Sequence, residues 1–375
     1  MHPRNPYVQP PDFAALARHD AALRPFVGAF PFPFDSADAM RALTRALLAQ
    51  DFGVRVELLS DRLCPTIPSR LNYILWIEDI MDAWSPFEPG PSARAPRSYA
   101  RGLDVGTGSI AVYALLACAR NPHWCMVGTD VDRVATAHAA RVVQGTSLRG
   151  RAELGDEERT AVGLRRQKRA RGAPRAADPP HPALRNLHQR ITLVERAPSD
   201  PLLDVDRTAP FHFSMCNPPF YASLEERAAA AAAKREPHST CEAADAELYT
   251  PGGEAAFVLR MVDESVQLQG HIGWYTTMLG KLSSVAQVVT RIKRETDNYG
   301  VTEFVQGRTR RWGVAWSFRG SRLPDSVARC GARALAALQP RTTCRVVQWP
   351  AGLDWLACLR TLRTLPADET SASKC

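Results

Sequence analysis

The chain has 375 residues, of which 45% are hydrophobic and 23% charged, a composition typical of a folded protein with one large domain or two modest ones. Its net charge of +8 is compatible with an anionic partner but does not require one. Nine cysteines occur without a C-x-x-C pair, which argues against a disulfide scaffold or a zinc site. The longest apolar run, 110–119, is too short to span a bilayer, and no signal-peptide core follows the N-terminus. We therefore expect a soluble intracellular protein.

Residues 1–101 are predicted to form a helical extension. In chain order, the pattern predicts a short helix at 12–19, a longer helix at 36–50 and a strand at 54–58. A largely apolar helix at 70–80 and a linker at 86–101 follow. Ser36 and Gly53 are suited to the N-cap and the C-cap of the second helix. Arg70 opens the apolar helix, where it is either a solvated helix start or a residue of a site.

From residue 102 onwards, strands and helices alternate as in a parallel sheet. The pattern predicts a strand at 103–105, a glycine turn at 106–109 and a helix at 110–120. A second strand at 124–129 and a second helix at 132–144 follow, and then two further strands at 191–194 and 211–216. Residues 145–185 interrupt this order and are predicted to be a disordered surface insertion. Their basic run, 165–171, is compatible with a nuclear signal, an RNA-binding arm or a solvated loop.

The second half of the pattern predicts a lid-like loop at 222–250, a helix at 254–267 and a strand at 273–279. A helix at 283–298 and two facing strands at 302–306 and 312–318 follow. A basic hairpin loop, 307–311, joins the last two strands. A helix-flanked parallel series that ends in an antiparallel pair is the topology of a seven-stranded methyltransferase sheet. We therefore expect an α/β, Rossmann-like class I methyltransferase core at 102–320. A short C-terminal appendage with a helix, a strand and another helix is expected at 321–375.

The strand at 211–216 leads directly into Asn217-Pro218-Pro219-Phe220. Two consecutive prolines end a strand because neither donates a backbone N–H, so the corner is rigid. An amide oxygen and a freed backbone carbonyl can accept both hydrogens of an amine conjugated to a ring, and an aromatic side chain can stack on that ring. This tetrapeptide is either a site for a planar amine or an ordinary strand-ending turn with a packed phenylalanine.

Gly106-Thr107-Gly108 is a short glycine turn at the end of the first core strand. It lacks the third glycine of the dinucleotide fingerprint, and it is not a nucleoside-triphosphate loop. Glycine permits close approach of a ligand where parallel strands end. Asp130 ends the adjacent strand, where its carboxylate is able to accept both hydroxyls of a ribose. The alternative for Asp130 is a helix N-cap.

The glycine turn, the acidic second strand and the Asn-Pro-Pro-Phe corner occur in an order that resembles S-adenosylmethionine-dependent amino-group methyltransferases. At that level, adenine N6, cytosine N4 and a glutamine amide are all possible targets. Longer motifs resemble the methyltransferase-like 16 family: residues 1–5 with 10–13, 41–44, 70–74, 104–108, 216–220, 306–309 and 311–312. That resemblance implies an RNA adenine-N6 methyltransferase acting on U6 small nuclear RNA, with bacterial relatives that methylate large-subunit ribosomal RNA.

The resemblance implies S-adenosylmethionine as cofactor, with contacts from Arg70, Gly106, Thr107, Gly108, Asp130, Asp200 and Asn217. Asp130 replaces the glutamate usual in vertebrate members, and Asp200 stands where relatives use a threonine. It also implies a catalytic corner made of Asn217, Pro218, Pro219 and Phe220, and RNA contacts from Arg4, Arg308, Arg310 and Arg311. The helical extension at 1–101 is therefore expected to bind RNA. The resemblance implies no metal.

Several alternatives stay open from the sequence. They are a ribosomal RNA adenine-N6 methyltransferase, a protein glutamine N-methyltransferase and a catalytically inactive RNA-binding protein. Residues 319–375 are too few for the large C-terminal RNA-binding region of vertebrate family members, so an mRNA-regulatory role is not expected. Nuclear residence, with the cytoplasm as a second location, is expected from the resemblance and the basic run. No membrane partner is expected, and the sequence does not predict an oligomeric state.

Overall fold

The computed structural model describes residues 1–28, 32–84, 99–146, 187–204, 209–232, 244–307, 309–331 and 335–342. All of these except Thr342 belong to one compact unit, Met1–Arg341. Several predicted features lie outside the described residues: the insertion beyond residue 146 with its basic run, most of the linker at 86–101, Arg308, and the strand and second helix expected in the C-terminal appendage. The predicted domain boundaries at 101 and 320 stay predictions.

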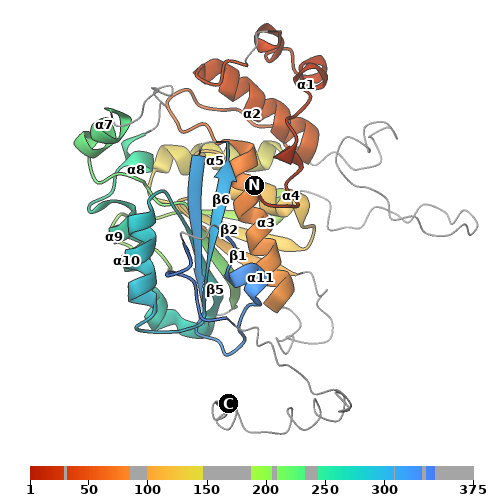
Figure 1. The fold of residues 1–375 in the computed structure, drawn as a ribbon. Coiled ribbons are helices and arrows are strands. Elements are labelled where there is room, and N and C mark those ends of the chain that lie inside the picture. The colour runs from red at the N-terminus through yellow and green to blue at the C-terminus, as the bar shows by residue number, and fades with distance from the viewer. Residues whose placement is uncertain are drawn as a thin grey trace, which may run out of the picture. The chain divides into compact units, whose positions relative to one another are not determined.

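A seven-stranded sheet forms the centre of the compact unit, in the order β3-β2-β1-β4-β5-β7-β6 (Figure 1). Strands β1 to β5 pair in parallel, whereas β7 runs antiparallel to both β5 and β6. The strands are, in chain order, Ala100–Val105, Trp124–Asp130, Ile191–Glu195, Phe211–Cys216, Ile272–Leu279, Tyr299–Gln306 and Thr309–Trp316. The predicted mostly parallel sheet with a final antiparallel pair is confirmed.

Helices cover both faces of this sheet, as expected when both faces of its parallel part are buried (Figure 1). Successive residues of a strand point to opposite faces of the sheet. On β4, Met215 belongs to the core that includes α3 and α4, and Cys216 belongs to the core that includes α9 and α10. The helices of the first face are α3 (Ile67–Trp84), α4 (Val112–Arg120) and α5 (Arg133–Gly145), and those of the second are α9 (Gly253–Leu268) and α10 (Leu282–Ile292).

Strand register brings the ends of three strands to one level. Val105 of β1 lies opposite Thr129 of β2 and opposite Cys216 of β4. Because all three strands run in the same direction, the residues that follow these partners meet at the same edge of the sheet. Those residues are Gly106, Asp130 and Asn217.

The N-terminal region contains α1 (Phe13–His19) and α2 (Ala37–Phe52). The predicted caps of α2 are confirmed: the Ser36 side chain accepts the Ala39 N–H, and Gly53 adopts a left-handed conformation with φ of 66°. The predicted strand at 54–58 is wrong, because these residues join no ladder. The segment is held instead by the Val54 N–H on the Leu48 carbonyl of the helix end and by the Thr146 hydroxyl on the Arg55 carbonyl.

The final hairpin is tighter than predicted. Gln306 pairs with Thr309, so Arg310 and Arg311 belong to β7 rather than to a basic loop. Helix α10 ends at Ile292, six residues before the predicted end. The chain then turns, and the Asn298 amide donates to the backbone carbonyls of Arg319 and Ser321.

Short α-helices beyond the core are α7 (Leu224–Ala232), α8 (Asp245–Leu248) and α11 (Asp325–Ala328), and the described residues also include the 3-10 helices Pro6–Val8, Arg24–Phe26, Leu187–Gln189 and Gln269–His271. Helices α7 and α8 belong to the predicted lid-like loop, whose two ends meet through a bridge between Tyr221 and Tyr249. Helix α11 corresponds to the first helix expected in the appendage. Within the described ranges, no helix combines the length and the apolarity needed to cross a membrane.

The first residues of the chain are fixed to α3 through a buried carboxylate, Glu78. Arg4 donates to Glu78 at 2.8 Å and to Asp79 at 2.5 Å. Arg120 and Asn121, at the end of α4, bind the same Glu78 carboxylate at 2.8 and 3.0 Å. Although burial opposes ionisation, these partners hold the pKa of Glu78 below its ordinary value. Glu78 therefore joins the N-terminal residues, α3 and the end of α4.

Replacing Glu78 with glutamine is expected to destabilise the fold, because both arginines lose their buried anionic acceptor. We expect the free energy of unfolding, measured by urea denaturation, to fall by about 1.5–3 kcal/mol. The matched control is Glu57→Gln at an exposed position, where we expect a change within about 0.5 kcal/mol. Equal stability of the two variants would contradict a structural role for the Glu78 cluster.

Candidate cofactor and target-base site

A cavity of about 160 Å³ lies at the carboxyl ends of β1, β2 and β4, where open parallel sheets bind their ligands. Its lining comes from the segment before α3, α3 itself, the glycine turn, the start of α4, the ends of β2 and β4, the segment after β3, the lid-like loop and α9. The structure brings ten of the predicted site residues together there: Arg70, Gly106, Thr107, Gly108, Asp130, Asp200, Asn217, Pro218, Pro219 and Phe220. The individual roles of these residues stay predictions.

The glycine turn leaves one wall of the cavity open. Gly106 has φ of 73°, a conformation that other residues rarely adopt. A Cβ atom on Gly106 would meet no atom within 4 Å, so the space above its backbone is free for a ligand. The N–H groups of Gly106 and Thr107 both donate to the Thr129 carbonyl at 2.9 Å, which ties the turn to the end of β2.

Asp130 occupies the end of β2 beside this turn. Its two carboxylate oxygens accept the N–H groups of Gly108 at 2.8 Å and of Asp132 at 3.0 Å. Burial nevertheless raises the pKa of Asp130 above its ordinary value. The alternative role of helix N-cap belongs to Asp132 instead, because its side chain accepts the N–H groups of Val134 and Ala135. Asp130 is thus free to bind hydroxyl groups with its remaining lone pairs.

Asp104 lies behind the glycine turn, where it binds Thr107 of the cavity lining, and the sequence analysis assigned it no role. It is fully buried, and its Oδ2 accepts the Thr107 hydroxyl at 2.7 Å, whereas Oδ1 has no hydrogen-bond partner among the described residues. Burial, reinforced by the nearby Asp130, raises the pKa of Asp104 to about 7. An acidic residue two positions before the first glycine of the turn was the available sequence signal. A buried carboxyl with a free oxygen favours a positively charged ligand group nearby.

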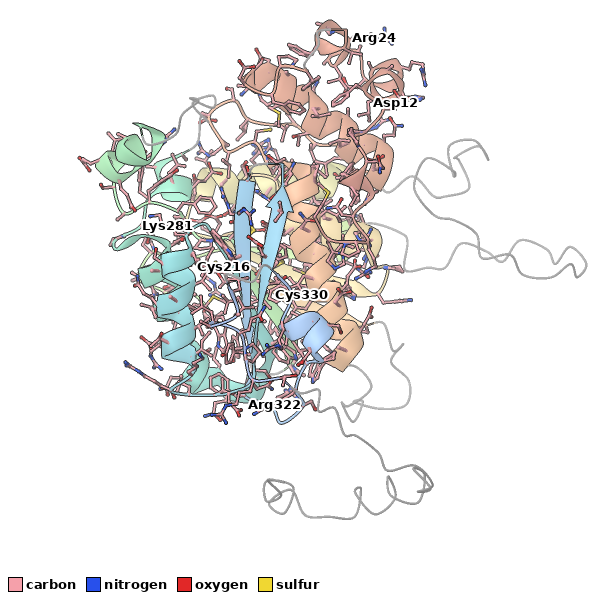
Figure 2. The ribbon with its side chains drawn as sticks, viewed as in Figure 1. Asp12, Arg24, Cys216, Lys281, Arg322 and Cys330 are labelled. Atoms are coloured by element: carbon pink, nitrogen blue, oxygen red, sulfur yellow. The ribbon has the colours of Figure 1, made fainter. Side chains whose placement is uncertain are left out.

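Asn217 presents an acceptor at the opposite wall of the cavity. Its side-chain Oδ1 is buried and has no hydrogen-bond partner in the described parts of the chain. The strand end before it is fixed, because the Cys216 N–H donates to the Tyr73 hydroxyl, which also bonds Thr276 at 2.7 Å. Figure 2 marks Cys216 within the fold, where its side chain is buried. A buried unpaired acceptor is costly, so Oδ1 is suited to receive a ligand hydrogen.

Phe220 closes the corner, and Glu254 fixes the backbone on which it packs. A Cβ atom on Gly280 would lie 3.0 Å from the Phe220 ring, so any larger residue there would push the ring or the backbone aside. The two oxygens of the buried Glu254 carboxylate accept the N–H groups of Gly280 at 2.7 Å and of Lys281 at 2.8 Å. Glu254 was also missed. Its place after Gly252-Gly253 was the only sequence signal.

Two guanidinium groups, Arg70 and Arg311, approach this site. The guanidinium carbon of Arg70 lies 6.0 Å from the Tyr113 ring centroid, and that of Arg311 lies 5.0 Å from the Phe220 ring centroid. Burial and the repulsion from Arg70 lower the pKa of Arg311. Within the described ranges, neither arginine forms an ion pair with a carboxylate. This end of the site therefore favours an anion.

The other predicted RNA-contact arginines lie elsewhere or outside the described residues. Arg310 pairs with Glu303 at 2.6 Å on the exposed part of β7. Arg4 is engaged by the Glu78 cluster described above, with its side chain 43% exposed. Lys281, labelled in Figure 2 near the start of α10, contacts Glu226 and lies over the Tyr221 ring. RNA contacts by Arg4, Arg308, Arg310 and Arg311 stay predictions.

The lid-like loop and the N-terminal region meet across the mouth of the cavity. Glu247 of α8 accepts the N–H groups of Leu63 at 3.0 Å and of Ala244 at 3.1 Å, and both Leu63 and Glu247 line the cavity. Burial raises the pKa of Glu247. Sequence reasoning did not find this contact, because it joins segments 184 residues apart. The contact closes the glycine-turn side of the cavity.

The strand order and this site together define a Rossmann-like class I methyltransferase. A nucleoside that carries a charged amino-acid tail fits the residues present: free space above Gly106, a hydroxyl acceptor at Asp130, and unpartnered buried polar atoms at Asp104 and Asn217. Within the described ranges, there is no cluster of three or more histidine, cysteine or acidic side chains suited to a metal ion.

Comparison with known proteins agrees with this class. A family model described as RNA methyltransferase matches residues 1–162 and 183–320. The U6 small nuclear RNA (adenine-(43)-N(6))-methyltransferase of Caenorhabditis briggsae is 34% identical over 349 residues, covering 85% of this chain and 62% of the relative.

Among the solved structures that match, two examples share 30% sequence identity with the chain. The hMettl16 catalytic domain in complex with MAT2A 3′UTR hairpin 1 has a TM-score of 0.66, with 86% of this chain and 96% of that chain covered. The N-terminal domain of human METTL16 in complex with SAH has a TM-score of 0.60, with 85% and 99% covered. The chain therefore belongs to the RNA methyltransferase family, and its resemblance to methyltransferase-like 16 proteins is confirmed.

The buried Asp104 is expected to make stability depend on pH. Its pKa of about 7 in the fold exceeds the ordinary value near 3.9, so the folded state retains a proton that the unfolded chain loses between these values. The unfolding free energy should therefore fall as pH rises from about 5 to 7, by up to about 1.4 kcal/mol per unit, and then level off. In urea denaturation of the ligand-free protein, Asp104→Asn should remove this fall in the unfolding free energy between pH 5 and 7. An identical pH dependence in both proteins would show that Asp104 titrates normally.

Proposed function

We propose that the chain is an S-adenosylmethionine-dependent RNA methyltransferase that makes N6-methyladenosine, with U6 small nuclear RNA as its substrate. The observation that carries this proposal is the buried, unpartnered Asn217 Oδ1 at a corner closed by Phe220, beside the open glycine turn. An acceptor next to an aromatic ring suits an aromatic amine. The confirmed family membership assigns the RNA methyltransferase class.

The corner residues activate the target amine by positioning it. The lone pair of adenine N6 is delocalised into the ring, which makes the amine a poor nucleophile. Asn217 Oδ1 and the Pro218 carbonyl would accept its two hydrogens, while Phe220 stacks on the base and fixes its plane. The nitrogen is then free to pyramidalise toward the methyl group. The proton leaves after transfer, so no strong base is required, and orientation supplies most of the rate enhancement.

The opposite wall of the cavity would hold the cofactor, which supplies a methyl group bound to a positively charged sulfur. Asp130 would accept the ribose hydroxyls, and the open backbone of Gly106 would lie against the cofactor. Arg70, which has no carboxylate partner within the described ranges, would bind the carboxylate of the amino-acid tail. The complex of human METTL16 with SAH supports this choice of cofactor.

An RNA target requires an adenine outside a stacked helix, because N6 of a stacked, paired base cannot reach a buried corner. Arg311 lies over Phe220, where it would meet the backbone of an inserted nucleotide, and the net charge of +8 favours a polyanion. The structure of the hMettl16 catalytic domain with an RNA hairpin supports an RNA substrate for this site.

The choice of U6 small nuclear RNA follows relatives named for that activity in Caenorhabditis briggsae and Schizosaccharomyces pombe. The chain spans about three fifths of the length of the first curated relatives it matches. The substrate is therefore proposed from the catalytic region alone. Residence in the nucleus, expected from the resemblance, is part of the same proposal.

Asn217→Ala is expected to abolish methyl transfer while leaving RNA affinity within about twofold, because it removes one acceptor from the reacting amine. The measurement uses labelled S-adenosylmethionine and a U6 small nuclear RNA transcript, followed by nucleoside analysis. We expect labelled N6-methyladenosine with the wild type and at least about 100-fold less with the variant.

Other outcomes of that assay would contradict the proposal. Label in ribosomal RNA but not in the U6 transcript would reassign the substrate. Label in protein glutamine would exclude an RNA target, and cofactor binding without transfer would indicate a binding protein. A large loss of RNA affinity in Asn217→Ala would show that Asn217 holds RNA rather than the amine.

Reversing the charge of Arg310 and Arg311 together is expected to weaken RNA binding and its salt dependence. For every phosphate that the variant no longer binds, the slope of log K against log salt should become shallower by about 0.7–0.9. The matched control reverses Arg294 and Arg322, two exposed arginines beyond the end of α10; Figure 2 shows Arg322 well away from Lys281. If both double variants bind RNA alike, β7 is not part of the RNA surface.

A further inference from the structure

Tyr113 has a buried hydroxyl that no other group uses among the residues the structure describes. It lies in the first turn of α4, its residue is 3% exposed, and it lines the cavity. Its hydroxyl has no hydrogen-bond partner among the described residues. The neighbouring Tyr73, whose ring lies 5.6 Å away edge to face, has a hydroxyl bonded to Thr276 and Cys216. Packing alone therefore does not explain the Tyr113 hydroxyl, because phenylalanine would fill the same space without an unpaired polar atom.

The backbone before Tyr113 adopts an unusual conformation. Ala111, the N-cap of α4, has φ of 50°, in the left-handed region that non-glycine residues rarely occupy. The Ala111 side chain provides no cap for the N-terminus of α4. The first N–H groups of a helix carry partial positive charge, and an anion is the favoured partner at an uncapped end.

The charges around the hydroxyl also favour an anion. The Arg70 guanidinium carbon is 6.0 Å from the Tyr113 ring centroid, and Arg311 also acts on the hydroxyl electrostatically. Asp104 and the Cys216 thiol are the opposing groups. Burial raises the pKa of Tyr113 well above its ordinary value, so its hydroxyl stays protonated and able to donate. An acceptor beside two guanidinium groups is most stable when it is negatively charged.

We propose that the Tyr113 hydroxyl donates a hydrogen bond to the carboxylate of the cofactor's amino-acid tail, next to Arg70 and the N-terminus of α4. This assignment rests on the proposed cofactor. With the ribose at Asp130, the tail would cross the glycine turn toward β4, where Tyr113 lies beside Cys216. Tyr113 is thus a positioning residue. It fixes one end of the cofactor and thereby sets where the methyl group stands relative to Asn217.

Tyr113→Phe, which removes only the oxygen, tests this assignment by calorimetric binding without RNA. We expect affinity for S-adenosylmethionine and S-adenosylhomocysteine to fall about 10- to 100-fold. Affinity for 5′-methylthioadenosine, which keeps the nucleoside but lacks the carboxylate, should be unchanged. Tyr275→Phe is the matched control: its hydroxyl donates to the Gln269 carbonyl away from the cavity, so all three affinities should persist.

Thermal unfolding of the ligand-free proteins gives a second readout. Tyr113→Phe should melt at or above the wild-type temperature, because it loses no hydrogen bond, whereas Tyr275→Phe should melt lower. An equal loss of affinity for all three nucleosides would overturn the proposal, as would no loss for any of them. Failure of the wild type to bind any of the three would instead contradict the proposed cofactor itself.

A third measurement does not depend on the variant folding. The methyl ester of S-adenosylhomocysteine removes the negative charge from the ligand instead of the hydroxyl from the protein. The wild type should prefer the free acid at least tenfold, and Tyr113→Phe should reduce that preference. Equal wild-type binding of acid and ester would exclude a carboxylate subsite and refute the role of Tyr113.

Discussion

The proposed reaction depends on holding one amide oxygen away from water without a partner. Asn217 Oδ1 is buried and unpaired in the described structure, so the sheet must supply the free energy that keeps it there. Tyr73 and Thr276 provide part of it by fixing the end of β4 through hydroxyl groups. Pro218 and Pro219 then end the strand, because neither has a backbone N–H that it can donate to a neighbouring strand. A rigid, unsatisfied acceptor is what positioning catalysis requires.

Helix α3 connects this corner to the rest of the chain. It carries Tyr73, which supports β4, and Arg70, which enters the cavity, only three residues apart and therefore on one side of the helix. Glu78 further along the same helix binds Arg4 and Arg120. The N-terminal residues are thus structurally coupled to the helix that shapes the site, whether or not they also contact RNA.

The sequence alone predicted correctly those features that depend on residues close together in the chain. Ser36, Gly53, the order of strands and the Asn217 corner follow from caps, periodicity and proline. Predictions from the sequence were wrong where contacts with distant residues determine the structure. Residues 54–58 alternate between apolar and polar side chains but pair with no strand. Arg311 lies in β7 rather than in a loop, because the pairing of β6 and β7 continues to Gln306. Asp104, Tyr113 and Glu247 gain their roles from burial or from contacts between remote segments. A single sequence does not show which polar atoms a fold leaves unpaired.

The central claim is that Asn217 Oδ1 binds the amine of the target adenine. Its most direct test is a double-mutant cycle on RNA affinity with cofactor product bound, using transcripts with adenosine or purine riboside at the methylated position, against wild type and Asn217→Ala. We expect the two changes to be coupled: removing the amine from the RNA weakens RNA binding by the wild type up to about twofold but leaves RNA binding by Asn217→Ala unaffected. Equal losses in both proteins would show that the amine does not meet Asn217 and would contradict the proposed catalytic corner.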